Sequence, residues 1–91
     1  KKLNLPKPVI KPNEITLDCE HSIHYAQLNL NTTNQRGLLA YFVQCFDEAQ
    51  INIATAKIHT NKNMARDHFL IEKQNRMCDN AREIIAKLVG E

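Results

Sequence analysis

The sequence predicts an α+β fold, in which two helices cover one face of a four-stranded antiparallel sheet. Its 91 residues suffice for one domain with a single modest core. Four segments alternate apolar and polar residues, which is the period of a strand, and two others repeat apolar residues at the three- and four-residue steps of a helix. These segments occur in the order strand, strand, helix, strand, strand, helix.

The N-terminal part predicts a linker followed by two paired strands. Residues 1–13 hold all three prolines and four lysines, which is typical of a linker tail, and we expect the domain itself to span residues 14–91. Because the first residue is Lys1 and not Met, we expect a piece of a longer protein. Residues 14–20 and 24–30 then alternate as half-buried strands, with Ala26, Leu28 and Leu30 on one face. Their short link favours antiparallel pairing.

The middle of the chain predicts a helix and a β-hairpin. From Gly37 the apolar positions follow the helical period, and Asn34 is the expected N-cap. A strand at residues 51–60 should meet a strand at residues 67–73 across a polar turn at residues 61–66. If Thr60 opposes Asp67, then Ile58 faces Phe69 and Ala56 faces Ile71, all on one apolar face.

The last element predicts a ferredoxin-like arrangement of the two layers. A helix at residues 80–89 follows from its apolar stripe, with Asp79 as N-cap and Gly90 as its stop. No residues remain for a strand after it. The right-handed crossover rule then leads to a ferredoxin-like sandwich whose usual last strand is replaced by the N-terminal strand at residues 14–20.

Composition narrows the classes of function. Lys and Arg number 12 and Asp and Glu number 10, with no block of like charge, so the charge singles out no polyanionic partner. Three cysteines without Cys-x-x-Cys spacing argue against a disulfide framework or a zinc knuckle, and favour the cytoplasm. No apolar stretch is long enough to predict a membrane span or a secretory signal.

Several short motifs resemble the ACT domain, a small regulatory module that binds amino acids. They are Asn34-Gln35-Arg36-Gly37-Leu38-Leu39, then Asn52-Ile53, Ala56-Lys57-Ile58 and Asp67-His68-Phe69. The chain looks most like the version at the C-terminus of bacterial PII uridylyltransferase/uridylyl-removing enzymes. It departs from that pattern where the family has Asp and this chain has Asn34, and where the family has Pro and this chain has Arg36.

The resemblance and the chemistry of amino acids together predict a ligand site. The backbone N–H groups of Arg36, Gly37 and Leu38 suit a carboxylate, because a helix N-terminus offers unpaired donors and partial positive charge. Gly37 lets a ligand approach the backbone closely. In serine-binding relatives, asparagines at the positions of Asn34 and Asn52 contact the effector. We therefore expect a site built from Thr32, Asn34, Arg36, Gly37, Leu38 and Asn52.

The same resemblance implies a regulatory role in nitrogen metabolism. It implies that the chain is no enzyme in itself, that its parent protein is a uridylyltransferase, and that glutamine is the effector. It also implies a homodimer, or pairing with another ACT domain. No cofactor, metal, nucleic acid or membrane enters this expectation. A bland alternative is that Asn34 only caps a helix and Asn52 only forms a turn.

Two other classes of function are weighed against this one. A ligand-free ACT-like dimerisation module would have the same fold and bind nothing. A single-stranded RNA-binding module would present its open sheet to bases, but the predicted face offers one tyrosine, Tyr25, beside Gln27, Asn29, His68 and Leu70. His59 and His68 are expected opposite each other, which is too few ligands for zinc. Asp47, Glu48 and Glu83 are expected on solvated helix faces.

Overall fold

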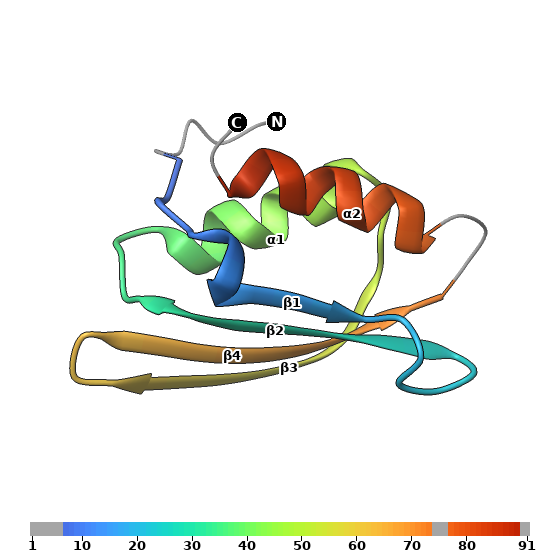
Figure 1. Cartoon of the computed structure of the whole chain (residues 1–91), viewed down its shortest axis with the longest axis horizontal. Helices are drawn as coiled ribbons and strands as arrows, with labels where there is room; N and C mark the ends of the chain where they lie inside the picture. The colour runs from blue at the N-terminus through green and yellow to red at the C-terminus, as the bar shows by residue number, and fades with distance from the viewer. Residues whose placement is uncertain (1–6, 74–76, 90–91) are drawn as a thin grey trace.

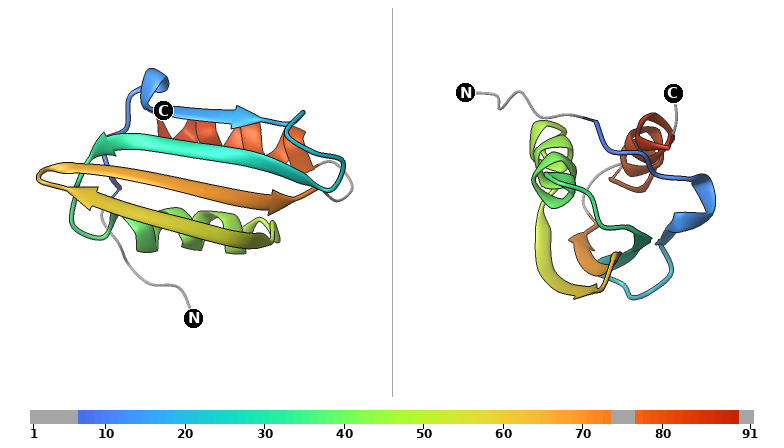
Figure 2. Two further views of the ribbon diagram at one scale, coloured as in Figure 1. Left: turned by 90° about the horizontal axis from the view of Figure 1, so that it is seen from below. Right: turned by 90° about the vertical axis from the view of Figure 1, so that its left-hand side faces the viewer.

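The structure is a computed structural model that describes residues 7–73 and 77–89. It is an α+β fold with a four-stranded antiparallel sheet and two helices. Both helices lie on the same face of the sheet, and the other face is left open (Figures 1 and 2). The strand order across the sheet is β1-β2-β4-β3, so β1 and β3 are the edge strands.

The elements follow the predicted order, with shifted bounds. They are a 3₁₀ turn η1 (Pro12–Glu14), β1 (Ile15–Asp18), β2 (Tyr25–Thr33), α1 (Leu38–Glu48), β3 (Ile53–Asn61), β4 (Met64–Glu72) and α2 (Met77–Leu88). No helix among the described residues combines the length and the apolar character that a membrane span requires.

The period-two pattern correctly assigns the faces of the central strands. Buried and less buried residues alternate along β2 and along β4. The pairing of β1 with β2 is antiparallel, as predicted, with Leu17 opposite Leu28. The ladder between β2 and β4 places Leu28 opposite Phe69, so that both side chains point toward the helices. A period of two therefore sorts the sheet into an apolar helix side and a polar open side.

The predicted register of the β3–β4 hairpin is wrong by two residues. Thr60 lies opposite Ala65 and not Asp67, and Ile58 lies opposite Asp67 and not Phe69. The reason is the turn, which has two residues and not six: Asn61 pairs with Met64, and Lys62 has a positive φ of 56°. Because the error is an even number, the side chains from Thr55 to Thr60 keep their predicted faces. A β-bulge between Ile53 and Thr55 shifts the alternation at the start of β3.

Both helix starts differ from the prediction. Gly37 and not Asn34 is the N-cap of α1, and no side chain caps this helix. Gly37 has a left-handed φ of 77°, a conformation that glycine adopts without steric cost. Helix α2 starts at Met77, so Asp79 lies inside its first turn and is not the N-cap. The predicted stop at Gly90 lies outside the described residues.

The core lies between the sheet and the two helices. Phe42 on α1 stacks against Phe46 at a centroid distance of 4.8 Å and against Phe69 at 5.0 Å. All three rings are at most 1% exposed. Ala81 and Leu88 place one side of α2 in the same core. The apolar stripes that predicted the two helices are thus the surfaces that the helices bury.

Part of the predicted linker packs against the domain. Ile10 is 3% exposed and belongs to the core. Beside it, the backbone of Val9 is held by the side chain of Gln35, whose amide donates to Val9 O and accepts from Val9 N, both at 2.8 Å. Residues 1–6 of the predicted linker lie outside the described residues.

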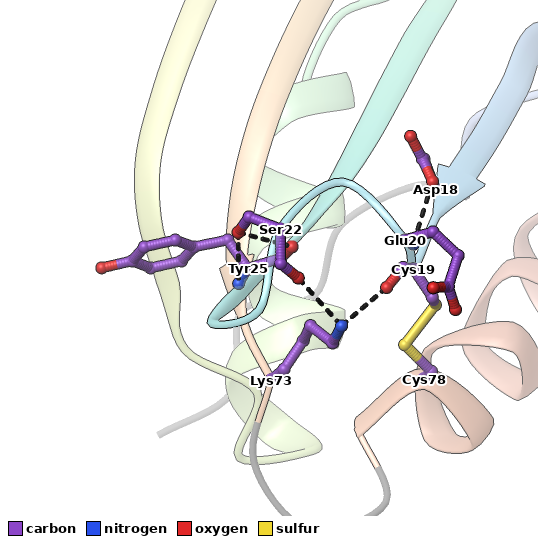
Figure 3. The surroundings of a disulfide bond; sticks show 7 residues. All are labelled: Asp18, Cys19, Glu20, Ser22, Tyr25, Lys73 and Cys78. Carbon is purple, nitrogen blue, oxygen red and sulfur yellow. Dashed lines mark hydrogen bonds between the residues drawn. A yellow bond between two sulfur atoms is a disulfide. The ribbon is translucent and has the colours of Figure 1, made fainter.

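The expectation that the cysteines form no disulfide is wrong. Cys19, after β1, and Cys78, in the first turn of α2, form a disulfide with their Cα atoms 6.4 Å apart (Figure 3). The two cysteines are 59 residues apart, so the local spacing rules used above could not reveal the pair. The same corner is held by Lys73, whose ammonium donates to Cys19 O at 2.7 Å and to Ser22 O at 3.0 Å. Cys45 takes no part in this disulfide.

Candidate functional site

The two predicted asparagines lie at opposite ends of the sheet. The backbone N–H of Asn34 donates to Asn63 O at 2.6 Å, beside the first residue of β4. The backbone carbonyl of Asn52 accepts from Glu72 N at 3.0 Å, beside the last residue of β4. Strand β4 has nine residues, which span about 25–30 Å. The expectation that both asparagines line one pocket within a single chain is therefore wrong.

The error comes from the β2–α1–β3 connection. Asn34 precedes α1 and Asn52 follows it, and the helix together with its flanking loops carries the chain from one end of β4 to the other. The prediction assumed that Asn34 and Asn52 are close in space because both flank the same helix in the sequence. Both side chains are exposed, so each is open to a ligand or to another chain.

The helix start offers fewer free donors than expected. The backbone N–H of Leu38 donates to Gln35 O at 3.1 Å, and the Leu38 side chain is 3% exposed in the core. Arg36 is exposed, and Gly37 is half-buried at the start of α1. An ideal Cβ added to Gly37 would meet nothing within 4 Å, so the backbone here is open to approach. Asn34, Arg36 and Gly37 thus remain together at this end of the sheet.

The hydroxyl of Thr32 makes a hydrogen bond within the fold and is not open to a ligand. It is 0% exposed, and its hydroxyl donates to Glu14 Oε1 at 2.9 Å. The same oxygen of Glu14 accepts from Lys11 N at 2.8 Å. These donors favour the ionised carboxylate and lower the pKa of Glu14, with the Lys11 N–H as the larger cause. Thr32 therefore anchors η1 and is closed to a ligand in the single chain.

Asp67 is a buried carboxyl on the apolar face of the hairpin, as its position in the alternating strand predicts. It is 2% exposed, and its Oδ1 has no hydrogen-bond partner. Burial raises the pKa of Asp67, while the backbone N–H of His59 and the nearby histidine charges act in the opposite direction. The sequence feature that points to Asp67 is a charged residue at an inward-facing position of an alternating strand.

A cavity of about 440 Å³ lies elsewhere, between the two helices. It is lined by Lys7, Tyr41, Cys45, Glu48, Ala49, Ile84 and Leu88. Its volume falls within the range of small-molecule sites, yet none of the predicted ligand residues lines it. Glu48, assigned to a solvated helix face by its position in α1, lies at the edge of this cavity.

The two histidines of the β3–β4 hairpin are not opposite each other, contrary to the predicted register. His59 pairs with Arg66, and His68 pairs with Lys57. His68 Nδ1 lies 2.6 Å from Asn29 Oδ1, so it carries the proton that this carbonyl oxygen accepts. Within the described residues, no group of three or more His, Cys, Asp or Glu side chains could hold a metal ion.

A scan against protein-family models found no match to the chain, and searches of curated proteins and of solved structures found no significant match either.

Proposed function

We propose that the chain is an amino-acid-sensing regulatory domain of the ACT type that works as a homodimer. The strand order β1-β2-β4-β3 supports it, because this is the order of a ferredoxin-like sheet whose last strand is replaced by the N-terminal strand. The motifs at Asn34–Leu39, Asn52–Ile53 and Asp67–Phe69 support the family. The domain itself is regulatory and non-catalytic in this proposal.

The edge strand β3 supports dimerisation. Within the described residues no strand pairs with its outer edge, and all but one of its residues are exposed. Three exposed apolar side chains flank this edge: Ile58 on β3, and Leu39 and Val43 on α1, which are 44%, 37% and 42% exposed. Leu39 and Val43 lie four residues apart on the side of α1 away from α2, because Tyr41 and Cys45 face the cavity between the helices.

A two-fold pairing of β3 with β3 would bring Asn34 of one copy close to Asn52 of the other. Such a pairing is isologous and runs the two strands antiparallel. The β3 end near Asn34 of one copy then meets the β3 start near Asn52 of the other. Each dimer would gain two sites, each with one asparagine from either copy beside the start of an α1 helix. The opposite placement of Asn34 and Asn52 along β4 is the observation that carries this proposal.

The chemistry of such a site fits a free amino acid. The helix start can bind the carboxylate, and the two carboxamides can bind the ammonium and the side chain. Millimolar affinity corresponds to about 4 kcal/mol, which a few such contacts can supply. Coupling to a catalytic domain would use about 1–3 kcal/mol of it. We propose glutamine as effector and a PII uridylyltransferase as parent protein, on the resemblance alone.

The disulfide bears on where the protein works. Disulfides persist in oxidising compartments, whereas the proposed parent protein belongs to the cytoplasm. We propose the cytoplasm, in which case Cys19 and Cys78 would be largely reduced in cells. Alkylation of free thiols in freshly lysed cells, followed by mass spectrometry, distinguishes the two locations.

A subunit-mixing experiment tests both the dimer and the shared site. Calorimetry with glutamine should show binding to the dimer and none to Asn34→Ala or Asn52→Ala. Mixing the two variants should restore about one quarter of the wild-type sites, because half of the dimers become mixed and each mixed dimer has one intact site. Sedimentation should show that both variants remain dimeric.

The outcomes separate the alternatives. A site within one chain would show no restoration on mixing. A dimer that binds neither glutamine nor any other amino acid at millimolar concentration would make the chain a ligand-free dimerisation module. A monomer at all concentrations would contradict the proposal as a whole.

A further inference from the structure

One lysine, one arginine and two histidines form a compact block on the open face of the sheet. Lys57 and His59 on β3 lie opposite His68 and Arg66 on β4, respectively, and all four are exposed. We call them the cationic block. Neither helix covers this face, which is turned toward the viewer on the left of Figure 2. The two pairs are two residues apart along each strand, or about 7 Å.

Within the described residues, no carboxylate lies beside Lys57 or Arg66 on the open face of the sheet. The block's neighbours on β2 are Asn29, opposite His68, and Asn31, opposite Arg66. The one hydrogen bond that the block's side chains make joins His68 to Asn29. The acidic residues on this face of the sheet, Asp18 and Glu72, lie toward its other end, opposite Gln27 and Tyr25.

One carboxyl group lies on the other face of the sheet, below the block. Asp67 lies between Arg66 and His68 in the chain, and its carboxyl is buried on the helix side, where it interacts electrostatically with His59 and His68. Lys57 and Arg66 are exposed on neighbouring strands, two residues apart in the register, and their cross-strand neighbours on the open face are histidines and asparagines. An anionic partner would therefore stabilise this surface.

We propose that the cationic block binds an acidic polypeptide segment in an extended conformation. Alternate side chains of an extended segment point the same way and are about 7 Å apart, which is the spacing between the two pairs of the block. Carboxylates at alternate positions can therefore meet both pairs at once. Arg66 offers the fork of donors that holds a carboxylate with two hydrogen bonds, and Asn31 offers a further amide donor at the rim.

The composition of the block favours polypeptide over nucleic acid. Proteins that bind single-stranded RNA on a sheet stack bases on aromatic side chains. The block holds no Phe, Tyr or Trp, and the one tyrosine of this face, Tyr25, lies at the other end beside Glu72. The block instead matches carboxylates by charge and spacing.

Added salt should weaken the proposed binding. The side chains of Lys57 and Arg66 are exposed, so dissolved ions screen their attraction for the glutamates of a partner.

The test uses the 91-residue chain and a fluorescein-labelled peptide in which Glu alternates with Ser. Fluorescence anisotropy should show binding at low salt that weakens as salt is added. The double variant Lys57→Gln/Arg66→Gln should bind about tenfold or more weakly. Arg82→Gln, which removes an exposed charge on α2, is the control and should change affinity less than about twofold.

Three results would overturn the proposal. The first is equal binding by the double variant and the parent chain. The second is equal binding of a peptide with the same composition whose glutamates form one contiguous block. The third is tighter binding of an oligouridylate of the same charge, which would make the surface a nucleic-acid interface. None of these results bears on the amino-acid site, because no residue of the block belongs to it.

Discussion

Asp67 and Ile58 are direct cross-strand partners on the helix side of the sheet, yet Asp67 is 2% exposed and Ile58 is 44% exposed. The boundary of the core thus runs between β4 and β3. On its inner side lies a carboxyl group with one oxygen, Oδ1, that has no partner. On its outer side lies an apolar side chain in solvent. Both are costly arrangements for an isolated domain, and a second copy paired along β3 would cover Ile58.

Ionisation of Asp67 should make stability fall as the pH rises. Burial raises its pKa in the folded state, so the unfolded chain gives up this proton at lower pH than the native chain does. Stability is then lost from about pH 4 upward, through the raised pKa of the folded state. Asp67→Asn removes this contribution, and its advantage over the parent chain should grow between pH 4 and pH 7.

Urea unfolding at several pH values measures this difference. Asp47→Asn, which changes an exposed carboxylate on α1, serves as the control with little pH-dependent change. The prediction is contradicted if the difference in free energy of unfolding between Asp67→Asn and the parent chain stays constant or shrinks as the pH rises. Ionisation of Asp67 would then not destabilise the fold.

Loss of the disulfide should destabilise the domain strongly. The bond closes a loop over a sequence separation of 59, and removal of such a cross-link costs up to about 4 kcal/mol in the chain-entropy model. Cys19→Ser and Cys78→Ser should lower the unfolding midpoint equally, and the double variant should lower it no further. Cys45→Ser leaves the bond intact and is the matched control. Three reactive thiols in the non-reduced protein would contradict the bond.

Gly37→Ala should destabilise the start of α1 through the backbone alone. The φ of 77° costs an alanine about 1–2 kcal/mol, and an added Cβ meets no neighbour. Asn tolerates this conformation better, so Gly37→Asn should lose less stability. Thermal unfolding by circular dichroism ranks the three proteins. Equal losses for Ala and Asn would show that the conformation of Gly37 is not the cause.

Thr32→Val should release the contact between β2 and η1. The hydroxyl donates to a carboxylate, and removal of such a bond costs about 1–2 kcal/mol at pH 7. The pKa of Glu14 is lowered in the folded state, so the stability that its charge contributes is present above about pH 4 and lost as the pH falls further. The difference between Thr32→Val and the parent chain should therefore narrow at pH 3. Thr33→Val, an exposed neighbour on the open face, is the control.

The sequence predicts the elements, their order and their faces, because these depend on local periodicity. Ala26, Leu28 and Leu30 are buried as expected, and Lys57, His59 and His68 are on the open face. The cap of α1 was misplaced because Asn34 looks like a cap by type, whereas Gly37 caps by conformation. The hairpin register was misplaced because the polar run of residues 61–66 was taken as one long turn, whereas the turn is Lys62 and Asn63 alone and β4 begins at Met64.

The candidate site was harder to predict than the fold. A site depends on distances between elements, and motif spacing gives the order of residues along the chain only. Asn34 and Asn52 frame the same helix in sequence but lie at its two ends in space. The disulfide was not predicted for the same reason, because Cys19 and Cys78 come together only after β1 and α2 have packed.

The sheet consists of two local hairpins, β1–β2 and β3–β4, that join along the seam between β2 and β4. The β3–β4 hairpin closes over two residues, whereas partners across the seam, such as Leu28 and Phe69, are 41 positions apart in the sequence. Chain closure over such distances is slow compared with hairpin formation. The docking of the two hairpins is therefore the expected rate-limiting step of folding, and substitutions along the seam should act on the folding rate more than those in either turn.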